Sequence, residues 1–259
     1  MTMNEQTHGA GAAIVKKKRR RGGPPPAQAM PQFPCGIVAP DSASNPEYFL
    51  PPDHQTIDPA SLFERIAPVV IELGSGKGRF IIDAAMRRSD ANFIAVEWVN
   101  KYHKMIVLRA AIRGLKNIRV IRDDARHFIM DALGDHSIAE CHIYHPDPWP
   151  ETRHHKRRLV RPRFLSALHR VLAPDGQLIF QTDHQDLWSY SVKAIERYFN
   201  VSLLNGLWPD SPLGRTNYEI KAIQAGWPVF RLTATPLPHP PDADETERLE
   251  RLLEQVNEG

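Results

Sequence analysis

The sequence predicts an α/β protein with a doubly wound, mostly parallel sheet and helices on both faces. From about residue 66 onward, short runs of β-branched and aromatic residues alternate with longer amphipathic stretches. A glycine-rich turn also follows the first of these runs. Strands that are separated by helices pair in parallel, because the crossover helix returns the chain to the same end of the sheet. We therefore expect one sheet of seven strands.

Each expected element rests on its own pattern. The first five strand-like runs hold between four and seven residues and are bounded by turn residues, and "VSLLN" and "PVFRLTA" are expected to complete the sheet as a further pair. The expected strands are 67–73, 92–98, 117–121, 139–145, 176–182, 201–205 and 228–234. The expected helices are 78–88, 100–114, 125–132, 161–172, 184–198 and a short amphipathic helix within 242–259.

The chain has 259 residues, 42% of them hydrophobic, which is enough for one substantial core. We expect a disordered, basic and Pro-rich extension over 1–55, one domain over 56–235 and an acidic tail with a short helix over 236–259. The extension contains six consecutive cations, Lys16 to Arg21. A solubilising tail and a flexible arm that touches nucleic acid account for this run equally well.

The lack of a recognisable targeting signal and the small number of cysteines indicate the cytoplasm. No apolar run approaches the roughly 18 residues that cross a bilayer, and the N-terminal residues lack the apolar segment of a signal peptide. Cys35 and Cys141 are too few for a disulfide framework, so we expect two plain thiols in a reducing compartment. The sequence therefore predicts a cytoplasmic protein with no membrane partner.

The stretch "VIELGSGKGRF" places three glycines between the first strand and the first helix. Gly74, Gly76 and Gly78 allow positive φ and close approach of a ligand to the main chain. Their spacing fits neither the dinucleotide-binding fingerprint nor a P-loop. Glu72, just before the first glycine, suits a ligand with a positive charge. A turn with a purely structural role is the alternative.

Acidic residues also follow the next two strands. Glu97 stands where a nucleotide-binding sheet places the carboxylate that accepts hydrogen bonds from the ribose hydroxyls, although a surface glutamate has a similar sequence signal. Asp123 and Asp124 compete for two roles, an adenine contact and the cap of the following helix, and the position of Asp124 favours it for adenine. Together these loops predict a crevice at the switch point of the sheet.

The stretch "HPDPWPETRHHKRRLVRPRF" brings an acid, rigid turns and a basic cluster together. Pro146 and Pro148 restrict the backbone around Asp147, which we expect in the same crevice. Trp149 is expected either as a wall beneath a flat base or as part of the core. Six cations lie within 153–163 with no carboxylate between Thr152 and Ala173, so we expect a cationic rim and a polyanionic partner.

"PDPWPETRHHKRRLVRPRFL" resembles the signature of the tRNA (guanine-N7-)-methyltransferase family. "TD" at 182–183 and "RTNYEIKAIQAGWPVFRL" from Arg215 resemble later motifs of that family, and the similarity spans roughly residues 66 to 233. The resemblance implies a class I, Rossmann-like methyltransferase that moves a methyl group from S-adenosylmethionine to guanine N7 of tRNA, typically at position 46 of the variable loop. Monomer and homodimer both remain open.

The resemblance also implies roles for individual residues. Where the family commonly has lysines, this chain has Glu151 and Asn217, which puts cationic contacts to RNA at these positions in doubt. Cofactor binding is implied for Glu72, Gly74, Gly76, Gly78, Glu97, Asp124 and Asp147, with Asp147 also at the catalytic position. Substrate contacts are implied for Arg153, Asp183, Thr216, Asn217, Tyr218 and Glu219.

Other functions account for less of the pattern. Four histidines could suggest a metal site: His142, His145, His154 and His155. A metal site is not expected, because no Cys partner accompanies them and methyl transfer from a sulfonium needs no Lewis acid. Stacking is the expected use of His145. A methyltransferase for small molecules leaves the cations of 153–163 without a role. A non-catalytic RNA-binding module leaves the carboxylates of the crevice without one.

Overall fold

A computed structural model of the chain describes residues 47–48, 56–211 and 213–258. By contacts the chain divides into the units 1–38 and 39–259, and all described residues belong to the second. The expected extension over 1–55 therefore lies outside the described residues, apart from the two residues of a short strand.

The described residues form one sheet in the order β1-β4-β3-β2-β5-β6-β8-β7. Neighbours from β1 to β6 pair in parallel, while β8 is antiparallel to both β6 and β7. All seven expected strands are present, and β1 adds an eighth with only two residues. The strands are β1 (Glu47–Tyr48), β2 (Val69–Leu73), β3 (Asn92–Val96), β4 (Ile118–Ile121), β5 (Ile138–Tyr144), β6 (Leu172–Thr182), β7 (Phe199–Leu204) and β8 (Phe230–Pro236).

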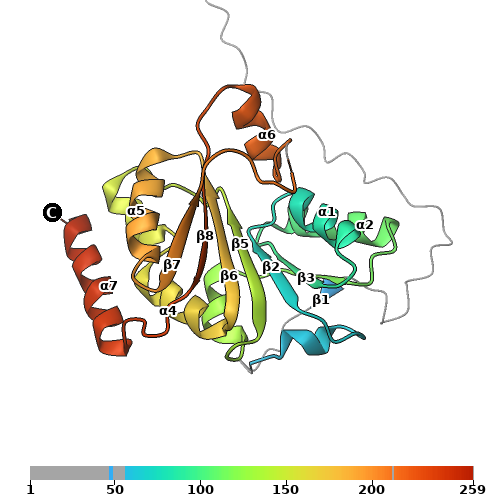
Figure 1. Cartoon of the computed structure of the whole chain (residues 1–259), viewed down its shortest axis with the longest axis horizontal. Coiled ribbons are helices and arrows are strands. Elements are labelled where there is room, and N and C mark those ends of the chain that lie inside the picture. The colour runs from blue at the N-terminus through green and yellow to red at the C-terminus, as the bar shows by residue number, and fades with distance from the viewer. Residues whose placement is uncertain (1–46, 49–55, 212, 259) are drawn as a thin grey trace, which may run out of the picture. The chain divides into compact units, whose positions relative to one another are not determined.

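Helices cover both faces of this sheet (Figure 1). In Figure 1, α1 and α2 lie on one side of the strands and α4 and α5 on the other, as expected for a doubly wound fold. The helices are α1 (Arg79–Arg87), α2 (Asn100–Ile112), α3 (Ala125–His127), α4 (Pro162–Val171), α5 (Gln185–Ile195), α6 (Asn217–Gln224) and α7 (Ala243–Glu258), with 3-10 helices η1 (Pro59–Leu62) and η3 (Thr152–Arg157) and a π-helical turn η2 (Phe128–Ala132).

Alternate residues of the central strands pack into two separate cores. In β2, Ile71 and Leu73 join the core beneath α4 and α5, whereas Val70 joins the core beneath α1 and α2. In β3, Ile94 and Phe93 divide in the same way. Side chains of successive strand residues point to opposite faces, so a strand that is apolar at every position must be covered on both.

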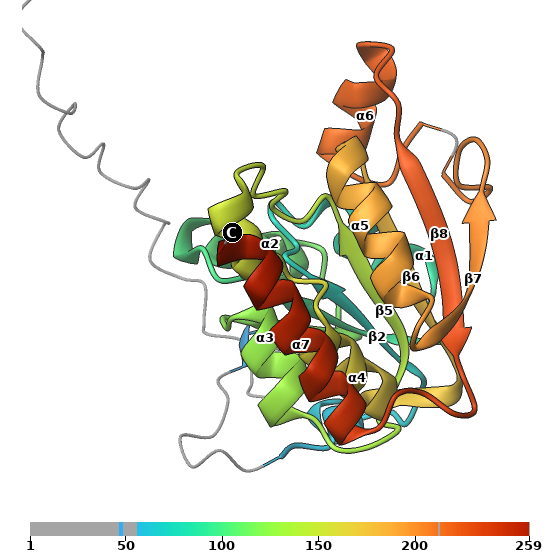
Figure 2. The ribbon, with the colours of Figure 1, turned by 90° about the vertical axis from the view of Figure 1, so that its left-hand side faces the viewer.

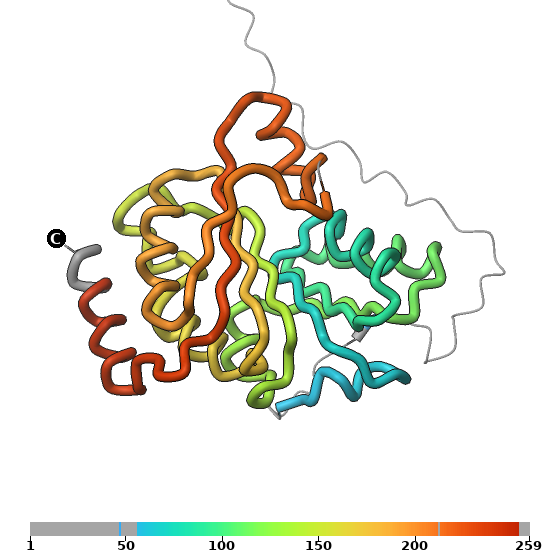
Figure 3. The backbone as a smooth tube through the Cα atoms, in the orientation of Figure 1, coloured from blue at the N-terminus to red at the C-terminus, as the bar shows by residue number. Residues whose placement is uncertain are grey.

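The C-terminal helix α7 packs against α4 and η3 (Figure 2). It confirms the amphipathic helix expected near the C-terminus, and Leu249 on its inner side is 9% exposed. The tube in Figure 3 shows the segment before α6 passing beside α1, where the carbonyl of Asp210 accepts from Arg87 at 2.9 Å. These two packings bring distant parts of the chain to the edges of the candidate site.

Candidate active site

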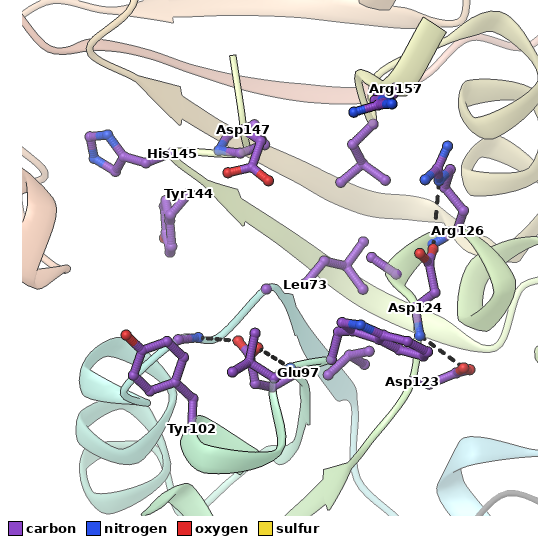
Figure 4. A pocket seen from close by; sticks show the side chains of 18 of the residues that line it. Leu73, Glu97, Tyr102, Asp123, Asp124, Arg126, Tyr144, His145, Asp147 and Arg157 are labelled. Atoms are coloured by element: carbon purple, nitrogen blue, oxygen red, sulfur yellow. Dashed lines mark hydrogen bonds and ion pairs between the residues drawn. The ribbon is translucent and has the colours of Figure 1, made fainter. Parts of the chain in front are cut away.

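A cavity of about 600 Å³ lies at the carboxyl ends of β2 to β5, where the chain turns from one half of the sheet to the other (Figure 4). Ligands of doubly wound sheets bind at this switch point. The sequence predicted Glu97, Asp124 and Asp147 among its lining, and all three line it. The lining also includes Trp98, Tyr102, Tyr144, Trp149 and Arg157.

The glycine turn forms one wall of the cavity. Gly74, Gly76 and Gly78 have φ of 72°, 52° and 70°, a region that glycine enters without steric cost. The amides of Gly74 and Ser75 both donate to the carbonyl of Val96, at 2.9 and 3.2 Å. The turn is thereby tied to the end of β3, and the main chain of Gly74 and Gly76 borders the cavity.

Glu97 is held at the floor of the cavity by backbone amides. Its Oε2 accepts from Gly76 N at 2.7 Å and its Oε1 accepts from Val99 N at 2.7 Å. The residue is 6% exposed. Each carboxylate oxygen can accept a second hydrogen bond, so both can also receive hydroxyl donors from a ligand. Figure 4 shows Glu97 and Asp147 on opposite sides of the cavity.

The two neighbouring aspartates have different surroundings. Asp123 accepts from Asp124 N with Oδ1 at 2.8 Å and pairs with His127 through Oδ2 at 2.7 Å. This carboxylate raises the pKa of His127, chiefly through the hydrogen bond. Asp124 caps α3 with Oδ1, which accepts from Arg126 N at 2.8 Å. Asp124 therefore both caps the helix and has its Oδ2 available to the cavity.

Asp147 lies in a loop whose backbone is fixed from two directions. His145 and Trp149 have positive φ, 48° and 44°, and Arg158 Nε donates to the carbonyl of Pro148 at 3.0 Å. Asp147 is exposed and lines the cavity, and within the described part of the chain no hydrogen bond or ion pair engages its carboxylate. The side chain can thus accept donors from a ligand.

Trp149 is half-buried and lines the cavity, in agreement with the expected wall rather than with a place in the core. The guanidinium of Arg157 lies 4.9 Å from the centre of its ring. The ring of His154 meets it edge-on with centroids 5.9 Å apart. Cation–π and edge contacts of this kind fix the indole plane at the mouth of the cavity.

The arrangement of the basic segment 153–163 differs from our expectation. We expected all six cations of 153–163 at the rim, but Arg158 and Arg161 are 1% and 7% exposed and form ion pairs with Asp186 and Glu250. Arg163 pairs with Glu247 of α7 at 2.7 Å. Carboxylates far away in the sequence thus neutralise half of the cluster. The remaining cations, Arg153, Lys156 and Arg157, are exposed, and Arg153 contacts Glu151 at 2.5 Å.

A second cavity of about 340 Å³ adjoins the first and shares Gly74, Gly76 and His145 with it. Its lining includes Thr216, Asn217 and Tyr218 from the start of α6. Tyr218 is 69% exposed and stacks on His145 with centroids 5.9 Å apart, so His145 does stack as expected. Three residues implied as substrate contacts thus border the cavity.

Asp183 and Glu219 reach the site differently. Asp183 does not line either cavity, but its Oδ1 lies 3.0 Å from Nδ1 of His145. Glu219 is 0% exposed; its carboxylate accepts from Arg231 at 2.7 Å and from Arg215 N at 2.6 Å. With Thr216 as the helix cap, Glu219 fixes the start of α6. Substrate contacts by Asp183 and Glu219 stay predictions, and burial makes a direct contact by Glu219 unfavourable.

Glu72 is buried at the base of the second cavity. It is 3% exposed, and its Oε2 has no hydrogen-bond partner among the described residues. Burial raises its pKa to about 8, since removal from water disfavours the charged form. A buried oxygen without a partner beside the glycine turn suits a cationic ligand, as expected from the sequence.

His142 has a role that the sequence did not reveal. Its Nε2 lies 3.0 Å from Glu140 and its Nδ1 lies 2.8 Å from Tyr144 Oη, which also accepts from Arg215 at 2.7 Å. Burial lowers the pKa of His142, so the neutral ring carries its proton toward Glu140. The ring of His142 thereby links Glu140 and Tyr144, which belong to the same strand, β5. Among the described residues, no cluster of three or more His, Cys, Asp or Glu has the arrangement of a metal site.

The strand order and the carboxylate-lined cavity at the switch point define a Rossmann-like methyltransferase. The family model described as "Putative methyltransferase" matches residues 66–232. Among solved structures, the 16S rRNA methyltransferase KamB is similar with a TM-score of 0.51 and 16% identity, covering 66% of this chain and 88% of that chain. This likeness supports the fold alone.

Two curated relatives are similar over most of their length. A tRNA (guanine-N(7)-)-methyltransferase of Lactobacillus delbrueckii subsp. bulgaricus is 38% identical over 188 residues, covering 70% of this chain and 85% of the relative. One from Macrococcus caseolyticus is 33% identical over 177 residues, covering 66% and 83%. The chain belongs to the tRNA (guanine-N(7)-)-methyltransferase family and is an enzyme of that class. None of the helices in its described part combines the length and apolar character of a membrane crossing.

Proposed function

We propose that this protein transfers a methyl group from S-adenosylmethionine to N7 of guanine in tRNA, at position 46 of the variable loop. One observation carries the proposal: Asp147, on a loop with a fixed backbone, faces Glu97 across a cavity that continues to His145 and Tyr218. This arrangement offers a cofactor region and a substrate region that meet at one carboxylate. The names of the curated relatives support the same reaction.

The residues of the cavity fit the proposed cofactor. Glu97 can accept from the ribose hydroxyls, and the available oxygen of Asp124 can accept from the adenine amino group. The buried Oε2 of Glu72, without a partner in the described chain, suits the positive charge of the donor. When bound, S-adenosylmethionine supplies a methyl group on a positively charged sulfur.

The chain has to align the guanine rather than deprotonate it. Guanine N7 carries a free lone pair at neutral pH, so no general base is required before transfer. Alignment of the reacting atoms can contribute roughly 7–11 kcal/mol. Asp147 and Asp183 would accept from N1–H and the amino group of guanine, and their negative charge would stabilise the cationic product. Tyr218, exposed and stacked on His145, offers an aromatic surface for the base.

A methylation assay with defined RNA tests this proposal. The full chain is incubated with labelled S-adenosylmethionine and an unmodified tRNA transcript, and the product nucleosides are separated. We expect 7-methylguanosine with the wild-type transcript and none when guanine 46 is replaced by adenine. Labelling of both transcripts would refute the position, and absence of 7-methylguanosine from every tRNA would refute the reaction.

A variant of Asp147 tests the residue that carries the proposal. We expect Asp147→Ala to lower kcat by about a hundredfold, because it removes a charge aimed at the reacting base. The Kd for tRNA should stay within about threefold. Lys193→Ala, on the exposed surface of α5, is the matched control and should keep the wild-type rate. An unchanged rate for Asp147→Ala would exclude the proposed role.

A further inference from the structure

The cations of the signature segment (residues 153–163) are not all free to hold RNA, because three of them already form ion pairs with carboxylates of the protein. Arg158, Arg161 and Arg163 contact Asp186, Glu250 and Glu247. Arg158 and Arg161 are buried, and moving either of them to bind a phosphate would leave its carboxylate without this partner, which is unfavourable. If tRNA is the substrate, some of its phosphates must contact other cations.

A groove of about 610 Å³ on the opposite side of the glycine turn provides such cations. It lies between α1, α2 and the segment before α6. Four arginines line it: Arg79, Arg109, Arg113 and Arg215. We propose that this arginine groove binds the phosphate backbone of the tRNA next to the methylated base. The inference rests on the proposed function and adds to it the path of the RNA across the surface.

The sequence builds the groove from the same turn that borders the cofactor cavity. Gly78 has no side chain, and a Cβ at this position would lie 2.7 Å from Ile106 of α2. The close contact brings α2 against the turn, where Arg109 donates to the carbonyl of Lys77. Arg113 follows Arg109 by one helical turn and therefore lies on the same face of α2. Arg79, the first residue of α1, completes the row.

Charge in the groove favours an anion. Its two carboxylates are already engaged: Asp83 pairs with Arg87 at 2.8 Å and Asp210 pairs with Arg215 at 2.6 Å. No ion pair between a described carboxylate and Arg79, Arg109 or Arg113 occurs in the structure. Arg79 and Arg113 are also exposed. Arg79, Arg109 and Arg113 are thus three clustered cations without an ion-pair partner among the described residues, which is the electrostatic pattern of phosphate binding.

The arginine groove is continuous with the site of the reaction. It shares Arg79 and Asn217 with the second cavity, which in turn shares Tyr144 and His145 with the cavity of Asp147. Two further exposed cations, Lys77 and Lys221, line the connecting part. The cations thus follow an extended path instead of converging on one point. A chain of phosphates fits this path better than one small anion does.

Salt dependence of tRNA binding tests the inference. The probe is unmodified tRNA, and its Kd is measured without cofactor between about 50 and 200 mM salt. We expect the double substitution Arg79→Glu/Arg113→Glu to weaken binding at least tenfold and to reduce the slope of log K against log salt by about two, one for each phosphate contact. Arg109 is left intact because it also fixes the turn.

The matched control changes the same amount of charge elsewhere. Lys116→Glu/Lys193→Glu alters a lysine that borders a different hollow and a lysine on α5. This control should bind with a Kd within about threefold of wild type and with a slope nearly unchanged. Equal losses in the two double variants would show that only net charge matters and would overturn the arginine groove. Thermal melting of both variants separates binding from folding.

Two further measurements separate tRNA binding in the groove from a role in the chemical step and from lipid binding. At saturating tRNA, Arg113→Glu alone should methylate at a rate within about twofold of wild type, because Arg113 lines the arginine groove and neither of the two cavities of the candidate active site. If no tRNA is methylated but the difference in salt slope remains, the reaction is wrong and the groove stands. Vesicles of anionic phospholipid are the competing ligand. Vesicle binding that the substitution abolishes, with tRNA binding unaffected, would assign the groove to a lipid surface instead.

Discussion

His145 donates its Nδ1 proton to the carboxylate of Asp183 across 3.0 Å. The direction follows from two neighbours. The indole N–H of Trp208 can only donate, and it lies 2.5 Å from Oε1 of Gln181. The amide nitrogen of Gln181 therefore faces Nε2 of His145, at 2.7 Å, and that ring nitrogen must accept. The remaining proton is on Nδ1, where it holds Asp183.

A substitution of His145 tests whether this hydrogen bond positions Asp183. His145→Phe keeps an aromatic ring beside Tyr218 but loses the donor. We expect kcat for tRNA to fall about tenfold, the equivalent of roughly one hydrogen bond, with the Kd for the cofactor unchanged. His145→Asn retains a donor and tolerates the positive φ of 48°, so it should lose less. Equal kcat for the two variants, both as stable as wild type, would contradict the role.

Glu72 predicts a pH dependence of cofactor binding. In the free protein its pKa is raised to about 8 by burial, so the group is mostly neutral at pH 7. A positively charged ligand binds the ionised form, and affinity should therefore rise as pH rises toward the free-state pKa and level off above it. When the pH is raised from 7 to 8.5, we expect the affinity of wild type for S-adenosylmethionine to increase about tenfold more than the affinity of Glu72→Gln does.

Titration calorimetry measures this effect directly. Both proteins bind the same cofactor in the same buffers, so the difference in proton release between wild type and Glu72→Gln is assigned to the buried carboxyl. At pH 7, wild type should release more protons on binding than the variant does, as judged from heats in two buffers. Identical proton release would show that Glu72 keeps its proton in the complex.

Breaking the contact between α7 and the signature segment should lower the stability of the protein. Arg161 and Glu250 form an ion pair in which both side chains are 8% exposed, whereas Arg163 and Glu247 are 56% and 39% exposed. Glu250→Gln should lower the free energy of unfolding by about 3–5 kcal/mol, because it leaves a buried charge without its partner. Urea unfolding measures the change.

Glu247→Gln is the control in the same helix. It removes an exposed pair and should cost no more than about 1 kcal/mol. A second check replaces both buried partners: Arg161→Met/Glu250→Leu should be more stable than Glu250→Gln alone. If the exposed and the buried substitution cost the same, the burial of the pair does not determine its contribution.

The alternation of strands and helices was sufficient to predict the doubly wound sheet. Each central strand is apolar at nearly every position, and such strands must lie between two layers of helices. The short helix α6 was not predicted, although its signal was present: Thr216 and Glu219 have the spacing of a capping box. Its length of eight residues gave too little periodicity to recognise.

The partners of the arginines could not be read from the sequence. Arg158 and Arg163 contact carboxylates that are 28 and 84 residues away along the chain. Only tertiary folding brings these groups together, so a local cluster of cations looked like an exposed rim. The cavity carboxylates were easier to predict, because each directly follows a strand and the carboxyl ends of parallel strands meet at one edge.

The contact of Gly78 with Ile106 has a consequence for how this enzyme can change during evolution. The same missing side chain lets Ile106 approach the turn that borders both the second cavity and the arginine groove. Any larger residue at position 78 would clash with the side chain of Ile106 and would be strained at a φ of 70°, so either Ile106 or the turn would have to shift. Exposed side chains such as Arg113 and Lys221 can be exchanged without disturbing this turn, so evolutionary change is less restricted at the surface than at position 78.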